Sequence, residues 1–132
     1  MNEIDTKSAS LLLRAFAHPT RLAILQELSN GPKCVTDLED LLPVRQANLS
    51  QHLALLRHTQ LVDFAQDSQT RCYYLAKPRL TRLLLDELAR NEKPVSKLIE
   101  QIKAEKAQAD AKQFDAQKKR QKSTHRTERV RE

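Results

Sequence analysis

The chain has 132 residues, 4% of them aromatic and none of them Trp, and it carries a formal net charge of +6. This length allows one small domain plus an extension, and the scarcity of aromatic residues leaves the core to Leu, Ile, Val and Ala. No run approaches the roughly 18 consecutive apolar residues that a membrane span needs, so we expect no membrane partner.

The two ends of the chain differ in charge. The acidic N-terminus, residues 1–5, has no apolar core of a signal peptide, which favours a cytoplasmic location. Residues 103–132 hold ten Lys and Arg against five Asp and Glu. A basic tail favours a polyanionic partner, although a solvated tail that only aids solubility explains the charge equally well.

Apolar residues at helical spacing predict two helices in the first thirty residues. The first has a cap at Asp5 or Thr6, ends near Ala17, and carries apolar residues on more than one side, which is typical of a helix with two packing partners. The second begins at Pro19, which suits a first helical turn, and is ended by residues 30–32, Asn-Gly-Pro.

The next two predicted helices are short and close together. A brief extended segment, residues 33–35, precedes a third helix that we expect to begin at Thr36, because Thr36 and Glu39 have the spacing of a capping box. Residues 43–45 begin with a proline, end this helix and form a tight turn. A fourth helix then runs from Gln46 to about residue 59, which completes a helix-turn-helix unit.

Beyond Leu61 the apolar period changes from helical to alternating. Residues 62–64 and 71–75 predict two strands, and the polar residues 66–70 predict the tip of a hairpin. The sequence therefore predicts a mostly α-helical fold with a small β-hairpin wing, the winged helix-turn-helix arrangement.

Three regions follow from this element order. Residues 6–90 form the winged helix-turn-helix domain and end with a fifth helix that begins at Pro78. Residues 94–121 form a C-terminal helical extension, with an apolar stripe between Val95 and Ile102. Residues 122–132 form a basic tail that we expect to be disordered.

The fourth helix is the predicted recognition helix, Gln46 to His58. On a helical wheel Leu49, Leu53 and Leu56 share one face, while small and amide residues lie opposite. Asn and Gln can each make two hydrogen bonds to adenine in the major groove of double-stranded DNA. An ordinary amphipathic helix has the same pattern, and the helix-turn-helix-hairpin order favours DNA binding. The candidate DNA-contacting residues are Arg45, Gln46, Ala47, Asn48, Ser50, Gln51, His52, Arg57 and Arg71.

Several segments carry a family resemblance. They are Phe-Ala-His-Pro-Thr-Arg-Leu at 16–22, Val-Thr-Asp-Leu at 35–38, Leu-Ser-Gln-His-Leu-Ala-Leu-Leu-Arg at 49–57, Leu-Val at 61–62 and Tyr-Tyr-Leu at 73–75. Through them, residues 11–80 resemble the ArsR/SmtB family of bacterial repressors. The resemblance implies a homodimer formed through the first and fifth helices, an imperfect inverted-repeat operator, repression of transcription, and release of DNA when an effector binds.

The sequence departs from the family pattern in three places. Gln60 follows the recognition helix where the family often has Gly, and Gln69 or Thr70 stands where a Gly is usual at the wing tip. Arg45 replaces the small polar cap that often precedes the recognition helix. Arg71 is also the only basic residue between Val62 and Ala76, which predicts weak wing contacts.

The effector is unknown, and the sequence predicts no metal site and no cofactor. The fifth helix has Asp86 and Glu87 but no His, so the family's zinc site between paired fifth helices is missing. Cys34 matches the first position of the family's Cys-Val-Cys-Asp-Leu-Cys arsenic motif, but Thr36 and Glu39 replace the other two thiols.

Cys34 and Cys72 form a possible thiol sensor. In a winged helix the segment before the third helix pairs with the second wing strand, which would place these residues on adjacent strands. A disulfide between them needs Cα atoms within about 7 Å. The alternative is that each cysteine is simply a small buried apolar residue.

Two other classes of function compete with a repressor. The first is a dimeric interaction module with only non-specific nucleic-acid binding, because the wing is plain and the sensor motifs are absent. The second is an enzyme. We do not expect an enzyme, because the chain lacks a Gly-rich phosphate loop, a nucleophile beside a base, and paired acids in a cleft-forming context.

Overall fold

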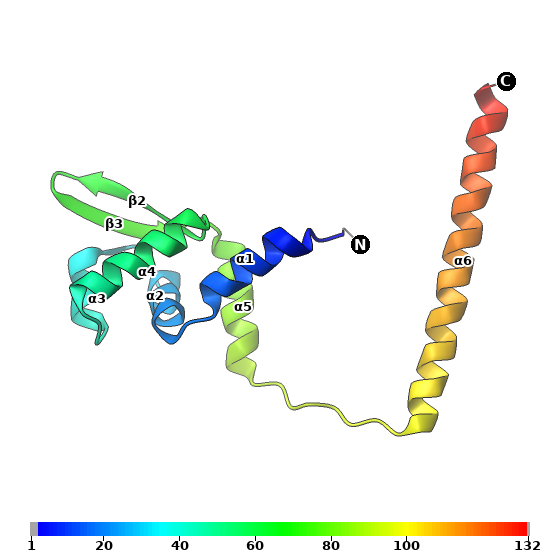
Figure 1. The fold of residues 1–132 in the computed structure, drawn as a ribbon, viewed down its shortest axis with the longest axis horizontal. Coiled ribbons are helices and arrows are strands. Elements are labelled where there is room, and N and C mark those ends of the chain that lie inside the picture. The colour runs from blue at the N-terminus through cyan, green and yellow to red at the C-terminus, as the bar shows by residue number, and fades with distance from the viewer. Residues whose placement is uncertain (1–2, 132) are drawn as a thin grey trace. The chain divides into compact units, whose positions relative to one another are not determined.

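The computed structural model describes residues 3–131, and it describes side chains up to residue 126. The chain divides into two compact units, Met1–Glu92 and Lys93–Glu132. The first unit contains five helices and a small sheet, and its hairpin extends away from the helices (Figure 1).

The first two helices have the predicted bounds. Helix α1 (Thr6–Phe16) is capped by Asp5, whose side chain accepts a hydrogen bond from the Lys7 N–H. Helix α2 (Pro19–Ser29) starts at Pro19. His18 caps it, because its Nδ1 accepts a hydrogen bond of 3.0 Å from the Thr20 N–H.

Helix α3 (Val35–Leu41) begins at Val35. The predicted start at Thr36 was therefore wrong by one residue. The N-cap is Cys34, and its N–H donates to Asp37 Oδ2 at 2.9 Å. The carboxylate three residues after the cap therefore belongs to Asp37, and Glu39 has no part in this bond. Helix α4 (Gln46–His58) has the predicted bounds.

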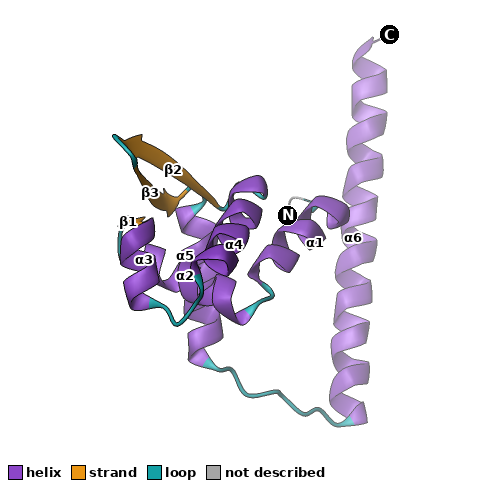
Figure 2. Cartoon of the chain, turned by 60° about the vertical axis from the view of Figure 1, so that its left-hand side comes forward, coloured by secondary structure: helices purple, strands orange, loops and turns teal. Residues whose placement is uncertain are grey.

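The sheet has three antiparallel strands in the order β1–β3–β2: β1 (Lys33–Cys34), β2 (Val62–Asp67) and β3 (Thr70–Leu75). Strands β2 and β3 form the wing, and Asp67 pairs with Thr70, so the loop between them has only two residues. Ser68 in this loop has a φ of 59°, which a glycine would adopt more easily. Strand β1 lies beside β3 next to α3 (Figure 2).

The core is made mostly of aliphatic side chains, with Phe16 and Tyr73 as its two aromatic members. It is formed by Ala15, Phe16, Ile24, Leu25, Leu28, Leu38, Leu42, Leu49, Leu53, Leu56, Leu61, Val62, Tyr73 and Leu75. These residues come from α1 to α4, from the sheet and, for Leu42 and Leu61, from the loops beside α3 and β2, so the core fixes the helix-turn-helix against the base of the wing. Helix α5 (Pro78–Arg90) packs on α2 and ends at Asn91, which has a left-handed conformation.

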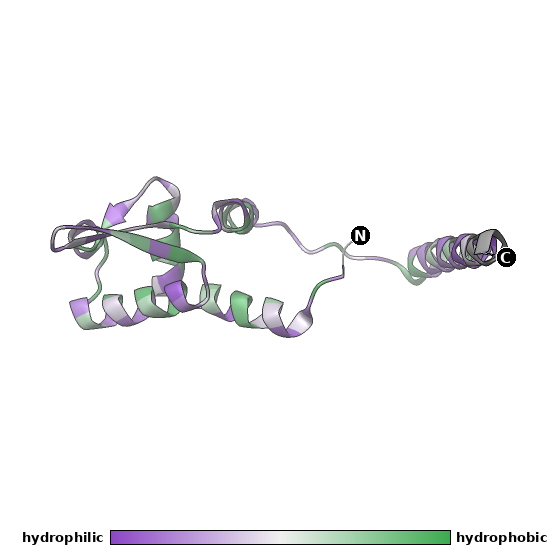
Figure 3. Ribbon diagram, turned by 90° about the horizontal axis from the view of Figure 1, so that it is seen from above, coloured by the Kyte–Doolittle hydropathy of each residue, from purple (hydrophilic) through white to green (hydrophobic). Residues whose placement is uncertain are grey.

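The second unit contains one helix, α6 (Ile99–Arg131). We expected a helix with an apolar stripe from Val95, but residues 91–98 form no helix. Pro94 disfavours a helical conformation in the residue before it, and Val95 and Leu98 are exposed. Most of α6 is hydrophilic (Figure 3).

Disorder was expected beyond residue 121, and the described backbone instead stays helical to Arg131. Residues 99–131 contain neither Gly nor Pro and are rich in Ala, Lys, Gln, Glu and Arg, which are strong helix formers. Residue 132 of the expected tail lies outside the described residues.

Candidate nucleic-acid interface

Helix α4 has one buried face and one open face. Leu49, Leu53 and Leu56 are at most 1% exposed, so they anchor the helix in the core. The residues predicted to contact DNA on its other sides are exposed: Gln46, Ala47, Asn48, Ser50, Gln51 and Arg57. A helix of this kind presents amide side chains without a bulky residue between them, which suits close approach to base edges.

The N-terminus of α4 is also open. Arg45 is the N-cap residue, and its backbone carbonyl accepts a bond of 2.9 Å from the Leu49 N–H. Its exposed side chain makes no capping hydrogen bond. The guanidinium of Arg45 and the N–H groups of the first turn therefore provide positive charge at one helix end, where a phosphate oxygen is favoured.

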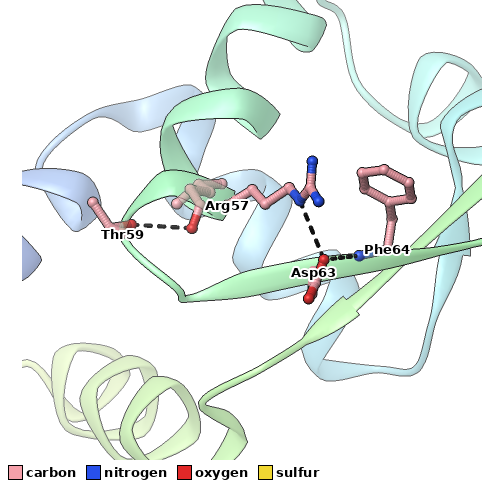
Figure 4. A network of polar contacts seen from close by, with 5 residues as sticks. Arg57, Thr59, Asp63 and Phe64 are labelled. Atoms are coloured by element: carbon pink, nitrogen blue, oxygen red, sulfur yellow. Dashed lines mark hydrogen bonds and ion pairs between the residues drawn. The ribbon is translucent and has the colours of Figure 1, made fainter.

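Phe64 on β2 brings two candidate arginines together. The guanidinium carbon of Arg57 lies 4.2 Å from the centre of the Phe64 ring, and that of Arg71 lies 4.6 Å from it. Arg57 Nε also donates to Asp63 Oδ1 at 3.2 Å, and the same oxygen accepts from the Phe64 N–H (Figure 4). The ring and the carboxylate thus hold one arginine from α4 and one from the wing at the junction between these elements.

His52 lies on a different side of α4 from the open face. It is half-buried, and its ring centre is 4.4 Å from that of His18. Its Nδ1 is 3.4 Å from Arg21 Nη1. Burial lowers the pKa of His52, and the nearby charges of His18 and Arg21 lower it further. The ring therefore connects α4 to Arg21 of α2, and a contact of His52 with DNA stays a prediction.

Sequence reasoning missed the role of Arg21. Besides contacting His52, Arg21 donates from Nε to the Ala15 carbonyl at 2.7 Å and from Nη2 to the Arg14 carbonyl at 3.0 Å. It thereby joins the end of α1, the start of α2 and the recognition helix. The only signal in the sequence was its place in the family-like segment 16–22.

Cys34 and Cys72 are joined by a disulfide. They stand directly opposite each other on β1 and β3, with their Cα atoms 3.8 Å apart. The predicted pairing of these strands is thus present. In the part of the chain that the structure describes, no three His, Cys, Asp or Glu residues gather as a metal site would require. No helix within residues 3–131 is long and apolar enough to cross a membrane.

The element order, the wing and the open face of α4 define a winged helix-turn-helix protein. A family model described as "Bacterial regulatory protein, arsR family" matches residues 18–63. The chain is 38% identical over 82 residues to the transcriptional repressor SmtB of Mycobacterium tuberculosis, a match that covers 62% of this chain and 61% of that protein. It is 33% identical over 92 residues to the regulator NmtR of the same species, covering 67% and 77%.

A solved structure, HlyU from Vibrio cholerae, superposes with a TM-score of 0.57 and 36% sequence identity. The superposition covers 63% of this chain and 94% of that one. The chain therefore belongs to the ArsR family of bacterial regulatory proteins. This family consists of transcriptional regulators and not of enzymes. The match to SmtB spans about three fifths of the length of that protein.

Proposed function

We propose that this chain is a homodimeric, sequence-specific repressor that binds an inverted-repeat operator in double-stranded DNA and acts in the cytoplasm. The observation that carries the proposal is the open face of α4, where Asn48 and Gln51 are exposed opposite three fully buried leucines. Some relatives, SmtB among them, are named transcriptional repressors, whereas HlyU of Vibrio cholerae is named a transcriptional activator.

A dimer would bury the apolar side chains that α1 and α5 leave in water. Leu13 on α1 is 55% exposed, and Leu83 and Leu88 on α5 are 56% and 58% exposed. Exposed leucines that cluster on an element are typical of a surface for a partner. A second copy of the chain would cover these leucines. It would also supply the second recognition helix that binding to an inverted repeat requires.

A fluorescence-anisotropy titration tests the proposal. The probe is the DNA directly upstream of the gene that encodes this chain, and the control is a shuffled fragment of equal length and base composition. We expect two chains to bind each upstream fragment, at least about a thousandfold more tightly than the shuffled DNA at the same salt concentration. Equal affinity for both fragments would support the non-specific interaction module instead.

A further inference from the structure

The disulfide closes a loop around the DNA-reading elements. Cys34 and Cys72 are 38 positions apart, and the residues between them contain α3, α4 and β2. Cys34 is the N-cap of α3, and Cys72 is the third residue of the wing strand β3. The bond therefore fixes the start of the helix-turn-helix to the wing.

Both sulfur atoms lie on the outer side of the sheet. Along β3, Tyr73 and Leu75 are buried in the core, while Tyr74 between them is exposed. Because side chains alternate along a strand, Cys72 shares the side of Tyr74 and points away from the core. Ala65, the partner of Cys72 on β2, is exposed as well. A half-buried sulfur pair at this surface is within reach of small oxidants and thiols.

Few other contacts hold the start of α3 against the wing. Strand β1 has two residues, so only Lys33 and Cys34 pair with β3. Within the seven residues of α3, Leu38 alone is fully buried. Without the disulfide, the position of α3 relative to β3 rests on this short ladder, on the buried Leu38, on the half-buried Val35 and on the Leu42 contact that follows the helix. The covalent bond therefore adds a constraint on α3 and on the turn that leads into α4.

We propose that Cys34 and Cys72 form a thiol–disulfide site that a hydroperoxide oxidises, and that the disulfide form binds the operator more tightly than the dithiol form. This proposal rests on the proposed DNA-binding function. The bond ties the start of α3 to β3, while the buried leucines of α4 keep that helix in the core. We therefore expect reduction to loosen α3 and the turn that leads into α4, and so to weaken the fit to DNA.

The oxidation proceeds in two balanced steps. One thiolate attacks a peroxide oxygen, the O–O bond breaks, and the products are a sulfenic acid and an alcohol or water. The second thiol attacks the sulfenic sulfur, the S–S bond forms, and hydroxide leaves with the thiol proton as water. Two electrons pass from the two sulfurs to the peroxide. Two equivalents of a small thiol reverse the reaction by disulfide exchange and are themselves oxidised to a disulfide.

The experiment compares one preparation of the full chain in both states. The protein is oxidised with hydrogen peroxide or reduced with dithiothreitol, each reagent is removed, and thiol titration verifies the state. Anisotropy then gives the Kd for the upstream DNA and for the shuffled fragment. We expect the oxidised chain to bind the upstream DNA about tenfold more tightly, and reoxidation of the reduced sample to restore that affinity.

Two variants complete the test. The double variant Cys34→Ser, Cys72→Ser should bind like the reduced chain and ignore peroxide. Ala65→Ser adds a hydroxyl beside Cys72 on the same side of the sheet and should respond as the wild type does. Equal affinity in the two redox states, or tighter binding by the reduced chain, overturns the redox proposal while the proposed function stands. If neither state prefers the upstream DNA, both proposals fail together.

Discussion

Gln51 lies near the middle of the open face of α4, one turn after Ala47, and its side chain is exposed. Its neighbours toward the start of α4, Ala47 and Asn48, are small or carry an amide, so a base edge can come close to it from that side, while the exposed Leu55 follows one turn later. Arg45 and Ser50 are exposed as well and are suited to phosphate oxygens, which position a protein without reading sequence. If the proposed function holds, we therefore expect base reading to depend most on Asn48 and Gln51 among these residues.

Gln51→Ala should reduce affinity for the upstream DNA about tenfold and leave affinity for shuffled DNA nearly unchanged. The reason is that a bidentate contact between glutamine and adenine contributes discrimination and little general attraction. Anisotropy titrations on both fragments measure this difference, with Gln26→Ala on the exposed side of α2 as the control. An equal loss of affinity on both fragments would count against a base contact.

His52 should make the stability of the fold depend on pH. Its pKa in the folded chain lies below the ordinary 6.5 because of burial and the charges of His18 and Arg21. Between this lowered pKa and 6.5, the unfolded chain therefore binds more protons than the folded chain. The free energy of unfolding falls as the pH drops through this interval to the folded pKa.

The measurement is the midpoint of urea unfolding between about pH 7.5 and about pH 5.5. The midpoint of the wild type should fall more over this range than that of His52→Gln, whose side chain does not titrate. Parallel changes in the two proteins would show that His52 does not contribute. His58 is exposed on the same helix, and His58→Gln serves as the matched control.

At the scale of elements, the end of α4 is a Schellman motif built without glycine. The Leu61 N–H donates to the Leu56 carbonyl at 3.0 Å, and the Gln60 N–H donates to the Arg57 carbonyl at 2.9 Å. Gln60 has a φ of 64°, a left-handed conformation that places its Cβ close to its own carbonyl group. Gln60 stands where the family often has Gly, and the chain keeps the left-handed conformation there at the cost of backbone strain.

Gln60→Gly should raise the free energy of unfolding by about 1 kcal/mol, because glycine adopts this conformation without a Cβ. The added flexibility of glycine in the unfolded chain offsets part of the gain. Urea unfolding of both proteins under oxidising conditions measures the change. A lower stability of the variant would mean that the Gln60 side chain makes a contact worth more than the strain.

The sequence predicted α1, α2 and α4 well because each has an unambiguous boundary: Asp5, Pro19 and the turn at 43–45. It was wrong at the start of α3, where both Cys34 with Asp37 and Thr36 with Glu39 have the spacing of a capping box. In the structure, the Cys34 N–H donates to Asp37, so the helix starts one residue earlier than predicted. The arginine pair on Phe64 was beyond prediction. Arg57 and Arg71 are 14 positions apart, and only the pairing of β2 with β3 brings them to one ring.

At the scale of the whole molecule, charge is distributed unevenly between the two units. Residues 112–131 carry eight Lys and Arg against two Asp and Glu, and the side chains described there, up to residue 126, are all exposed. Such a segment can contact phosphates without regard to sequence. It can equally be a solvated helix that contributes nothing to binding, and salt dependence separates these two possibilities.

Truncation after Ala111 should reduce the slope of log affinity against log salt concentration by about 0.9 for each phosphate that the removed segment neutralised, while operator preference is retained. A full-length variant with Lys118, Lys119, Arg120 and Lys122 replaced by Gln keeps the helix and should show the same direction of change. Unchanged slopes in both proteins would assign the tail to solubility.

We propose that this chain reads DNA sequence with a symmetric pair of recognition helices. The most direct measurement is a DNase footprint on the DNA upstream of its own gene. We predict one protected region that contains two inverted half-sites, with centres about one helical turn, or a whole multiple of it, apart. Weak protection spread evenly along the fragment would contradict the claim.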